Sequence, residues 1–163
     1  MAASEFERLH GVALARLFGG STAGRDVRIE MLPHEGWSSL APARGPAVVI
    51  RHRPRPRRLR GVPGGLTWRF AFTSEQLNRL RRLTRRGRLR LVLVCGREGR
   101  KQQGPEMALL EPREVEKILD LSSFLEQRLI VQAHPRKELW VLRNKIKVKV
   151  PRTRFQPRTQ AGT

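Results

Sequence analysis

The chain has 163 residues, in which 34 lysines and arginines against 14 aspartates and glutamates give a formal net charge of +20. This excess is far larger than solubility requires, so it predicts a polyanionic partner. The single cysteine, Cys95, excludes an internal disulfide and a cysteine-based zinc cluster, and a hydrophobic content of 39% argues against wholesale disorder. No stretch approaches the roughly 18 apolar residues of a membrane span, and the first residues lack the pattern of a secretory signal. We therefore expect a cytoplasmic protein with no membrane partner.

The positive charge is concentrated in two segments. Residues 51–101 hold seventeen basic and two acidic residues, and residues 143–158 hold seven basic residues and no acidic ones. A GC-rich genome would also favour arginine over lysine, here 28 to 6, but it would not remove acids from these two segments. The uneven distribution favours selection for binding.

The N-terminal part predicts one helix and two strands. Ser4 and Glu7 have the spacing of a capping box at the start of a helix over residues 4–18, with His10 and Arg16 off its apolar face. That apolar face comprises Phe6, Leu9, Ala13, Leu14, Leu17 and Phe18. Further strands are predicted over residues 27–32 and 47–50, with a loop over residues 33–46 that would leave Trp37 exposed.

The middle of the chain carries a strongly basic segment, residues 51–65. Pro54 and Pro56 hold its backbone extended, and the glycines at its far end predict a mobile loop. Residues 66–72 then alternate as a strand with Trp68 on the apolar face, which favours core packing for that ring. Thr73 and Gln76 have capping-box spacing and begin a helix predicted over residues 74–86.

The C-terminal part predicts mostly strands. Residues 89–95 and 107–110 indicate a hairpin in which Cys95 is a buried, inert thiol, and Pro112 opens a short helix. Three strands follow over residues 128–150, the last with a row of lysines on one face. We expect a mixed α/β or α+β fold, with a mixed β-sheet flanked by about three helices, as a single domain over residues 1–150; residues 151–163 form a basic polar tail.

Over residues 4–120 the order of elements, including LRLVLVCG and EMALLEPREVEKIL, resembles small PD-(D/E)XK nuclease-like domains related to restriction enzymes and Holliday-junction resolvases. The resemblance implies an Mg²⁺-dependent nuclease whose acids would be Glu7, Asp26 and Glu30. The family needs an E-x-K motif on the strand after its aspartate, but that strand here reads VVIRHR, with basic residues in those places. The resemblance therefore implies a degenerate domain that does not cleave.

Nucleic-acid binding is the function that the residues support most directly, because arginine forks to phosphate oxygens and stacks on bases. We expect a non-enzymatic accessory subunit of a nucleoprotein complex that contacts the phosphate backbone, needs no cofactor and favours RNA slightly over DNA. Two alternatives stay open: the metal-dependent nuclease, and a module that binds an acidic protein. The candidate binding residues are Arg51, Arg53, Arg55, Arg57, Arg58, Arg60, Arg81, Arg82, Arg85, Arg86, Lys145, Lys147 and Lys149.

Overall fold

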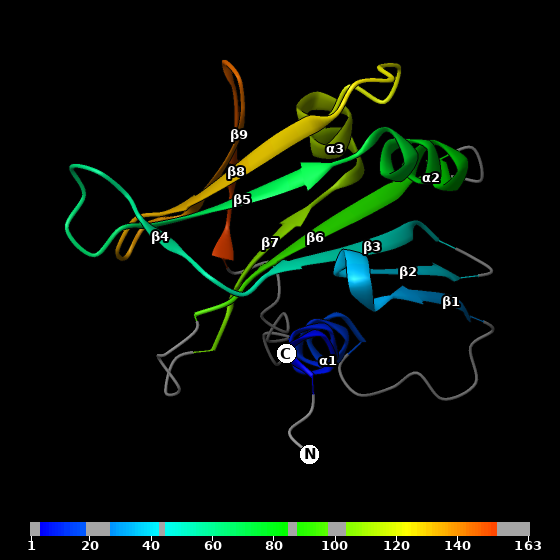
Figure 1. Cartoon of the computed structure of the whole chain (residues 1–163), viewed down its shortest axis with the longest axis horizontal. Helices are drawn as coiled ribbons and strands as arrows, with labels where there is room; N and C mark the ends of the chain where they lie inside the picture. The colour runs from blue at the N-terminus through cyan, green and yellow to red at the C-terminus, as the bar shows by residue number, and fades with distance from the viewer. Residues whose placement is uncertain (1–3, 19–26, 43–44, 85–87, 98–103, 153–163) are drawn as a thin grey trace, which may run out of the picture.

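The computed structural model describes residues 4–18, 27–42, 45–84, 88–97 and 104–152, which form two five-stranded sheets and three α-helices (Figure 1). Sheet A has the strand order β1-β2-β3-β6-β7, and sheet B has the order β10-β9-β8-β5-β4. The predicted α+β class is confirmed. The sequence predicts one mixed sheet, however, and the structure divides the strands between two.

Sheet A holds the N-terminal strands and the central hairpin. Its strands are β1 (Val27–Leu32), β2 (Trp37–Pro42), β3 (Ala47–Arg53), β6 (Leu89–Cys95) and β7 (Glu106–Leu110). Neighbouring strands are antiparallel except β3 and β6, which run parallel. The helix α1 (Glu5–Phe18) packs on the face of sheet A that points away from sheet B, and a 3₁₀ turn (Pro33–Glu35) joins β1 to β2 (Figure 1).

Sheet B is entirely antiparallel and holds the C-terminal strands. Its strands are β4 (Arg57–Arg58), β5 (Leu66–Phe72), β8 (Gln127–Ala133), β9 (Leu139–Arg143) and β10 (Ile146–Val150). The helices α2 (Ser74–Thr84) and α3 (Pro112–Ile118) bury their apolar side chains in the core between the two sheets. None of the helices in these described residues is long and apolar enough to cross a membrane.

The two predicted capping boxes are both present. At α1, the Ser4 amide donates to the Glu7 carboxylate at 3.0 Å and the Glu7 amide donates to Ser4 Oγ at 3.2 Å. At α2, the Thr73 and Gln76 pair makes the same reciprocal bonds at 3.0 and 3.2 Å. These contacts satisfy backbone N–H groups that have no partner inside the helix, so short-range sequence fixes where both helices begin.

The predicted loop over residues 33–46 is wrong in its middle, because residues 37–42 form β2. This strand pairs with β1 on one side and β3 on the other, and Ser38 and Ser39 are buried within it. Serines have low strand propensity, but pairing on both edges satisfies the backbone of β2 and overrides that preference. Trp37, expected to be exposed, is 1% exposed and belongs to the core.

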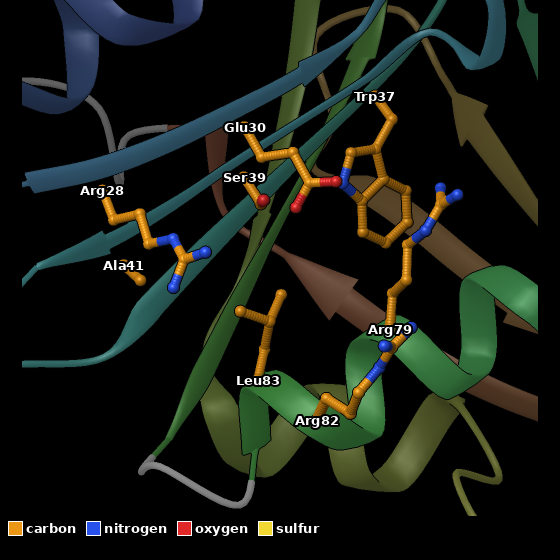
Figure 2. Close-up of a pocket in the computed structure, with 8 residues that line it drawn as sticks. All are labelled: Arg28, Glu30, Trp37, Ser39, Ala41, Arg79, Arg82 and Leu83. Carbon is orange, nitrogen blue, oxygen red and sulfur yellow. The ribbon is translucent and has the colours of Figure 1, made fainter.

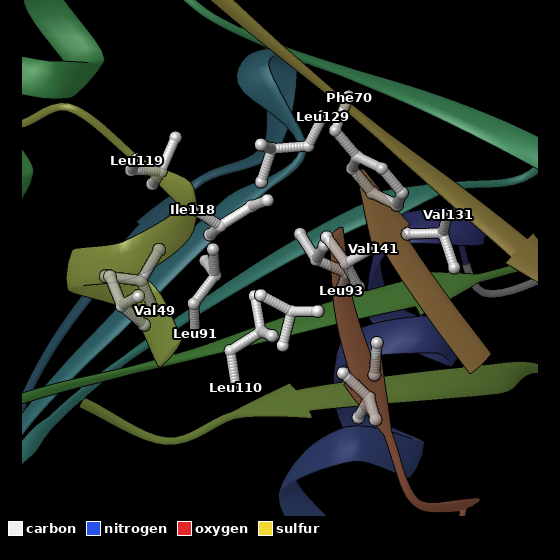
Figure 3. Close-up of a cluster of buried hydrophobic side chains, with 14 of the residues drawn as sticks. Val49, Phe70, Leu91, Leu93, Leu110, Ile118, Leu119, Leu129, Val131 and Val141 are labelled. Carbon is white, nitrogen blue, oxygen red and sulfur yellow. The ribbon is translucent and has the colours of Figure 1, made fainter. Parts of the chain in front are cut away.

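The main core lies between the two sheets and is closed by α3 (Figure 3). Alternate residues of β5, β8 and β9 point into it, among them Phe70, Leu129 and Val141, and they meet Leu91 and Leu93 of β6. The predicted core positions of Trp68 and Cys95 are confirmed. Complete burial raises the pKa of the Cys95 thiol well above its ordinary value, which keeps the sulfur protonated and unreactive.

The two sheets are joined where β3 leaves sheet A and the chain runs to β4. Gly96 lies at this junction: its amide donates to the Arg53 carbonyl at 2.7 Å, and its carbonyl accepts the Trp68 indole N–H at 2.9 Å. A Cβ at Gly96 would lie 2.8 Å from backbone atoms of Pro54, so only glycine allows this close approach. The junction fixes the arginine-rich segment against sheet B.

Candidate nucleic-acid interface

The arginine-rich segment predicted as a loop contains a short strand, β4, which belongs to sheet B. Arg57 and Arg58 form β4 and pair with Thr67 and Leu66 of β5. The turn beyond β4 is closed by the Leu59 amide, which donates to the Gly65 carbonyl at 3.0 Å, and its tip approaches the β8–β9 turn. Arg57 and Arg58 therefore extend from a backbone that is paired with β5.

Arg51 does not belong to this surface, although the sequence places it first in the basic segment. Its side chain is 6% exposed; its guanidinium donates to the Ala71 carbonyl at 2.9 Å and to Gln76 Oε1 at 3.3 Å, and it lies 4.8 Å from the Phe72 ring centroid. Burial, together with the charge of Arg53, lowers the pKa of Arg51 to about 10, so it stays protonated near neutral pH. Arg51 joins β3 to β5 and α2 inside the molecule.

Replacing Arg51 with methionine is expected to leave affinity for nucleic acid unchanged. Methionine fills a similar volume, and exchanging a buried ion for an apolar side chain is often close to neutral, so we expect a loss of no more than about 2 kcal/mol in the free energy of unfolding. Chemical denaturation and an RNA-binding titration on the same preparation measure both quantities. A large loss of affinity in a fully folded variant would return Arg51 to the binding surface.

A groove runs beside this segment on the β5 side. It has a volume of about 490 Å³ and is lined by Arg53, Arg55, Arg57 and Arg69, with Pro54, Pro56, Thr67 and Trp68 completing its walls. The Arg53 Nε donates to the Arg69 carbonyl at 2.8 Å, which holds the segment along β5. The groove thus gathers four guanidinium groups, the side-chain type that forks to phosphate and carboxylate oxygens.

The strand register of sheet B aligns two residues of this groove, Arg57 and Arg69, with residues on the other strands of the sheet. The outer face of sheet B, which points away from the core, carries two cross-strand rows. One row is Arg57, Thr67, Gln132, Trp140 and Lys149, and the other is Arg69, Ile130, Leu142 and Lys147. The described helices pack elsewhere, so no helix covers this face (Figure 1).

The two edges of the outer face of sheet B are basic and its centre is not. Arg57 and Arg69 lie toward the β4 edge, and Lys147 and Lys149 lie on β10 at the opposite edge. The long row crosses four inter-strand spacings, a width of about 19 Å. Arg57, Arg69 and Lys147 have exposed side chains that take part in no ion pair within the described residues.

Trp140 occupies the middle of this face. It is half-buried between Gln132 and Lys149, and the Lys149 ammonium lies 5.9 Å from the centroid of its ring. Lys149 also pairs with Glu138 at 3.2 Å, so both contacts hold its position beside the ring. The alternation of β9, in which Leu139 and Val141 point inward, is the sequence signal that places Trp140 on the outer face.

The remaining predicted binding residues lie in other places. Arg58 is exposed but alternates to the other side of β4, Arg60 is exposed in the turn after it, and Lys145 is exposed in the β9–β10 turn. Arg81 donates to Asn78 at 2.5 Å and covers the Phe124 ring at 4.8 Å. Arg85 and Arg86 lie outside the described residues.

Arg82 belongs to a second cavity, on the α2 side of sheet A (Figure 2). This cavity has a volume of about 460 Å³ and is lined by Arg28, Glu30, Trp37, Ser39, Ala41, Arg79, Arg82 and Leu83. Arg79 pairs with Glu35 and, at 3.2 Å, with Glu75, so it is neutralised locally. The helix arginines therefore do not form one continuous surface with the sheet B residues.

Two of the three acids implied by the nuclease resemblance, Glu7 and Glu30, lie on different elements and opposite faces of sheet A. Glu7 is on α1, where it caps the helix, whereas Glu30 is on β1 and points into the cavity on the opposite face of sheet A. Asp26 lies outside the described residues. No cluster of three or more histidine, cysteine, aspartate or glutamate side chains suited to a metal occurs among the residues that the structure describes.

A buried histidine pair under α1 was missed by sequence reasoning, which placed His10 off the apolar face. His10 is 1% exposed; its Nδ1 lies 2.5 Å from Ser38 Oγ, and its Nε2 lies 3.0 Å from Nδ1 of His52. Phe6 stacks on the His10 ring at 4.0 Å. Burial is the main cause that lowers the pKa of His10 to about 3, followed by the charges of His52 and Arg51.

Comparison with protein-family models, with curated proteins and with solved structures finds no match to this chain.

Proposed function

We propose that this protein binds single-stranded nucleic acid on the outer face of sheet B, with the arginine groove holding the phosphate backbone. The observation that carries the proposal is the row from Arg57 through Trp140 to Lys149, in which basic edges flank a tryptophan on a face that no described helix covers. Proteins that bind single strands combine these two features, a positive surface along the backbone and aromatic rings on which bases stack.

The apolar centre of the face favours a single strand over a duplex. A duplex presents phosphates on its outside and stacks its bases within, so it would leave Trp140, Ile130 and Leu142 without a partner. An unpaired strand turns its bases toward such a surface while its phosphates reach Arg57 or Lys147 at the edges. Ile130 and Leu142 are each half-buried and opposite one another, so they extend the apolar centre beside the tryptophan.

The groove supplies affinity that does not depend on sequence. Its four guanidinium groups are donors only, and each phosphate that they neutralise releases condensed counterions. Affinity should therefore fall steeply as salt rises. Because base stacking tolerates all four bases, we expect weak sequence preference.

The proposal is tested by titrating the protein into fluorescent single-stranded RNA, single-stranded DNA, duplex RNA and duplex DNA of roughly 12 nucleotides across a salt series. We expect the tightest binding to a single strand, RNA being the first probe, with intact ligand at the end. Preference for a duplex would overturn the stacking role of the face. Ligand that fragments only when Mg²⁺ is added would support the nuclease instead, and absence of binding at low salt would point to an acidic protein partner.

Replacing Trp140 with alanine is expected to weaken single-strand binding by about tenfold or more, because stacking on one ring contributes about 1–3 kcal/mol per base. The salt dependence should stay the same, since no phosphate contact is removed. Trp140→Phe keeps an aromatic face and should recover most of the affinity. Equal losses in the alanine and phenylalanine variants would show that Trp140 supports the sheet and does not contact bases.

A further inference from the structure

β1 is the edge strand of sheet A and pairs only with β2 among the described residues. Its other edge therefore presents a row of backbone N–H and C=O groups beside which no strand of the described residues lies. Sheet proteins usually protect such an edge, because it is a template for pairing with another chain. Here the strand is six residues long and contains no proline.

Apolar side chains are exposed on the same strand. Ile29 is 52% exposed and Met31 is 49% exposed, and these two belong to the small set of large apolar side chains exposed in the described residues. Ile29 stands opposite Leu40, which packs under α1, so Ile29 lies on the same face of sheet A as α1. Its exposure shows that α1 does not cover this part of the face. An apolar surface beside an unpaired edge favours association with another strand.

The charges of β1 identify the strand that fits. Arg28 and Glu30 alternate with the apolar residues and point to the α2 face of the sheet, where both line the second cavity (Figure 2). Neither takes part in an ion pair among the described residues. If two copies of β1 run antiparallel with Ile29 opposite Ile29, each Arg28 stands directly opposite a Glu30 of the other copy. The sequence of β1 is therefore complementary to itself in this register.

We propose that the chain forms a homodimer in which β1 pairs antiparallel with β1 of a second copy, with Ile29 at the two-fold axis. The two A sheets then form one ten-stranded sheet, Ile29 and Met31 of both copies become covered on one face, and two Arg28–Glu30 pairs form on the other. Such an interface is isologous, since the same residues serve on both sides. It is separate from the outer face of sheet B, so the dimer would carry two copies of that face.

The second cavity itself does not require a small ligand to explain its charges. In the proposed dimer Arg28 and Glu30 have complementary partners, and Trp37, which also lines the cavity, is only 1% exposed. The β1 edge accounts for the exposed apolar residues as well, which a ligand in this cavity would not cover.

The test is sedimentation equilibrium of the full chain and of charge-reversed variants, at moderate salt and over a range of protein concentrations. Arg28→Glu and Glu30→Arg each place like charges opposite one another twice, so each variant alone should raise the dimer dissociation constant at least about tenfold. The double variant restores opposite charges and should recover the parent value. A mixture of the two single variants should form a heterodimer, because every opposing pair is then complementary.

A matched control reverses two exposed charges on α3, Arg113→Glu and Glu116→Arg, and should leave the association unchanged. Circular dichroism checks that each variant is folded. If one single variant is less stable, the recovery of dimerisation in the mixture of the two variants still distinguishes the proposed interface from a loss of folding. A parent protein that stays monomeric up to roughly millimolar concentration would overturn the proposal. So would a dimer whose dissociation constant is unaffected by both single reversals, since its interface would lie elsewhere.

Discussion

Replacing Arg57, Arg69 and Lys147 together with glutamate is expected to lower the affinity for single-stranded RNA by at least about a hundredfold at physiological salt. These side chains lie at both basic edges of the outer face of sheet B and have no ion-pair partner among the described residues, so each is available for a phosphate. The reversal removes about three phosphate contacts and adds repulsion. The slope of log affinity against log salt should therefore fall in magnitude by about 2.

A matched control separates this surface from net charge alone. Arg82, Arg113 and Lys117 are exposed residues of α2 and α3, and none lies on the outer face of sheet B. Reversing these three also changes the formal net charge from +20 to +14. We expect the control to lose only a few-fold in affinity, with its salt slope nearly intact. Equal losses in both variants would mean that the molecule attracts RNA through its overall charge and that the outer face of sheet B has no special role.

The stability of the fold is expected to fall in mild acid because of His10. The unfolded chain binds a proton at this residue below about pH 6.5, whereas burial holds the pKa of the folded residue at about 3. Between these values the unfolded state binds more protons, so the free energy of unfolding decreases as the pH falls. For His10 alone the decrease is about 2 kcal/mol between neutral pH and pH 5, which corresponds to about 4–8 °C in the melting temperature.

The geometry of the histidine pair explains why protonation destabilises the folded state. His10 Nε2 and His52 Nδ1 are 3.0 Å apart, and a hydrogen bond between them needs one bare nitrogen and one N–H. If both rings were protonated, two N–H donors would face each other. The positive charges of Arg51 and Arg53 also disfavour a protonated His52, whereas the negative charge of Glu5 favours it. Burial also lowers the pKa of His52, so its effect on stability has the same sign.

The measurement is thermal unfolding from pH 7.5 to pH 4.5 of the parent protein and of two variants. His10→Gln keeps a side chain that hydrogen-bonds to Ser38 and does not titrate, so its melting temperature should depend less on pH. His34→Gln, at an exposed histidine, should follow the parent curve. If His10→Gln keeps the full pH dependence of the parent, the acid sensitivity arises from other groups.

The sequence by itself determined the local structure, wherever the contacts that stabilise an element are made within a few residues. Ser4 with Glu7 and Thr73 with Gln76 cap their helices through contacts three residues apart, so their spacing is visible in the sequence. The alternation of residues 66–72 is equally visible, because a strand with one face in the core repeats every two residues. The α+β class and the buried state of Cys95 follow from the same kind of pattern.

Tertiary structure alone decided which residues share a surface. β2 forms despite its serines because it is paired on both edges, and His10 is buried because Ser38 and His52 offer hydrogen bonds on the facing sheet. Arg51 leaves the basic surface because β5 and α2 provide acceptors and an aromatic ring inside the molecule. Each of these outcomes depends on partners far away in the chain, which no local pattern reports.

The candidate interface also depends partly on local sequence and partly on tertiary structure. The arginines of residues 51–60 and the lysines of residues 145–149 are evident in the sequence as basic segments, and their charge predicts a polyanion. Only the register of β4, β5, β8, β9 and β10 places Arg57 and Lys149 at opposite ends of one row with Trp140 between them. Composition therefore predicts the class of partner. Strand pairing over long sequence separations decides which of these residues share a face, because a shift of one residue in register would turn every one of these side chains to the other face.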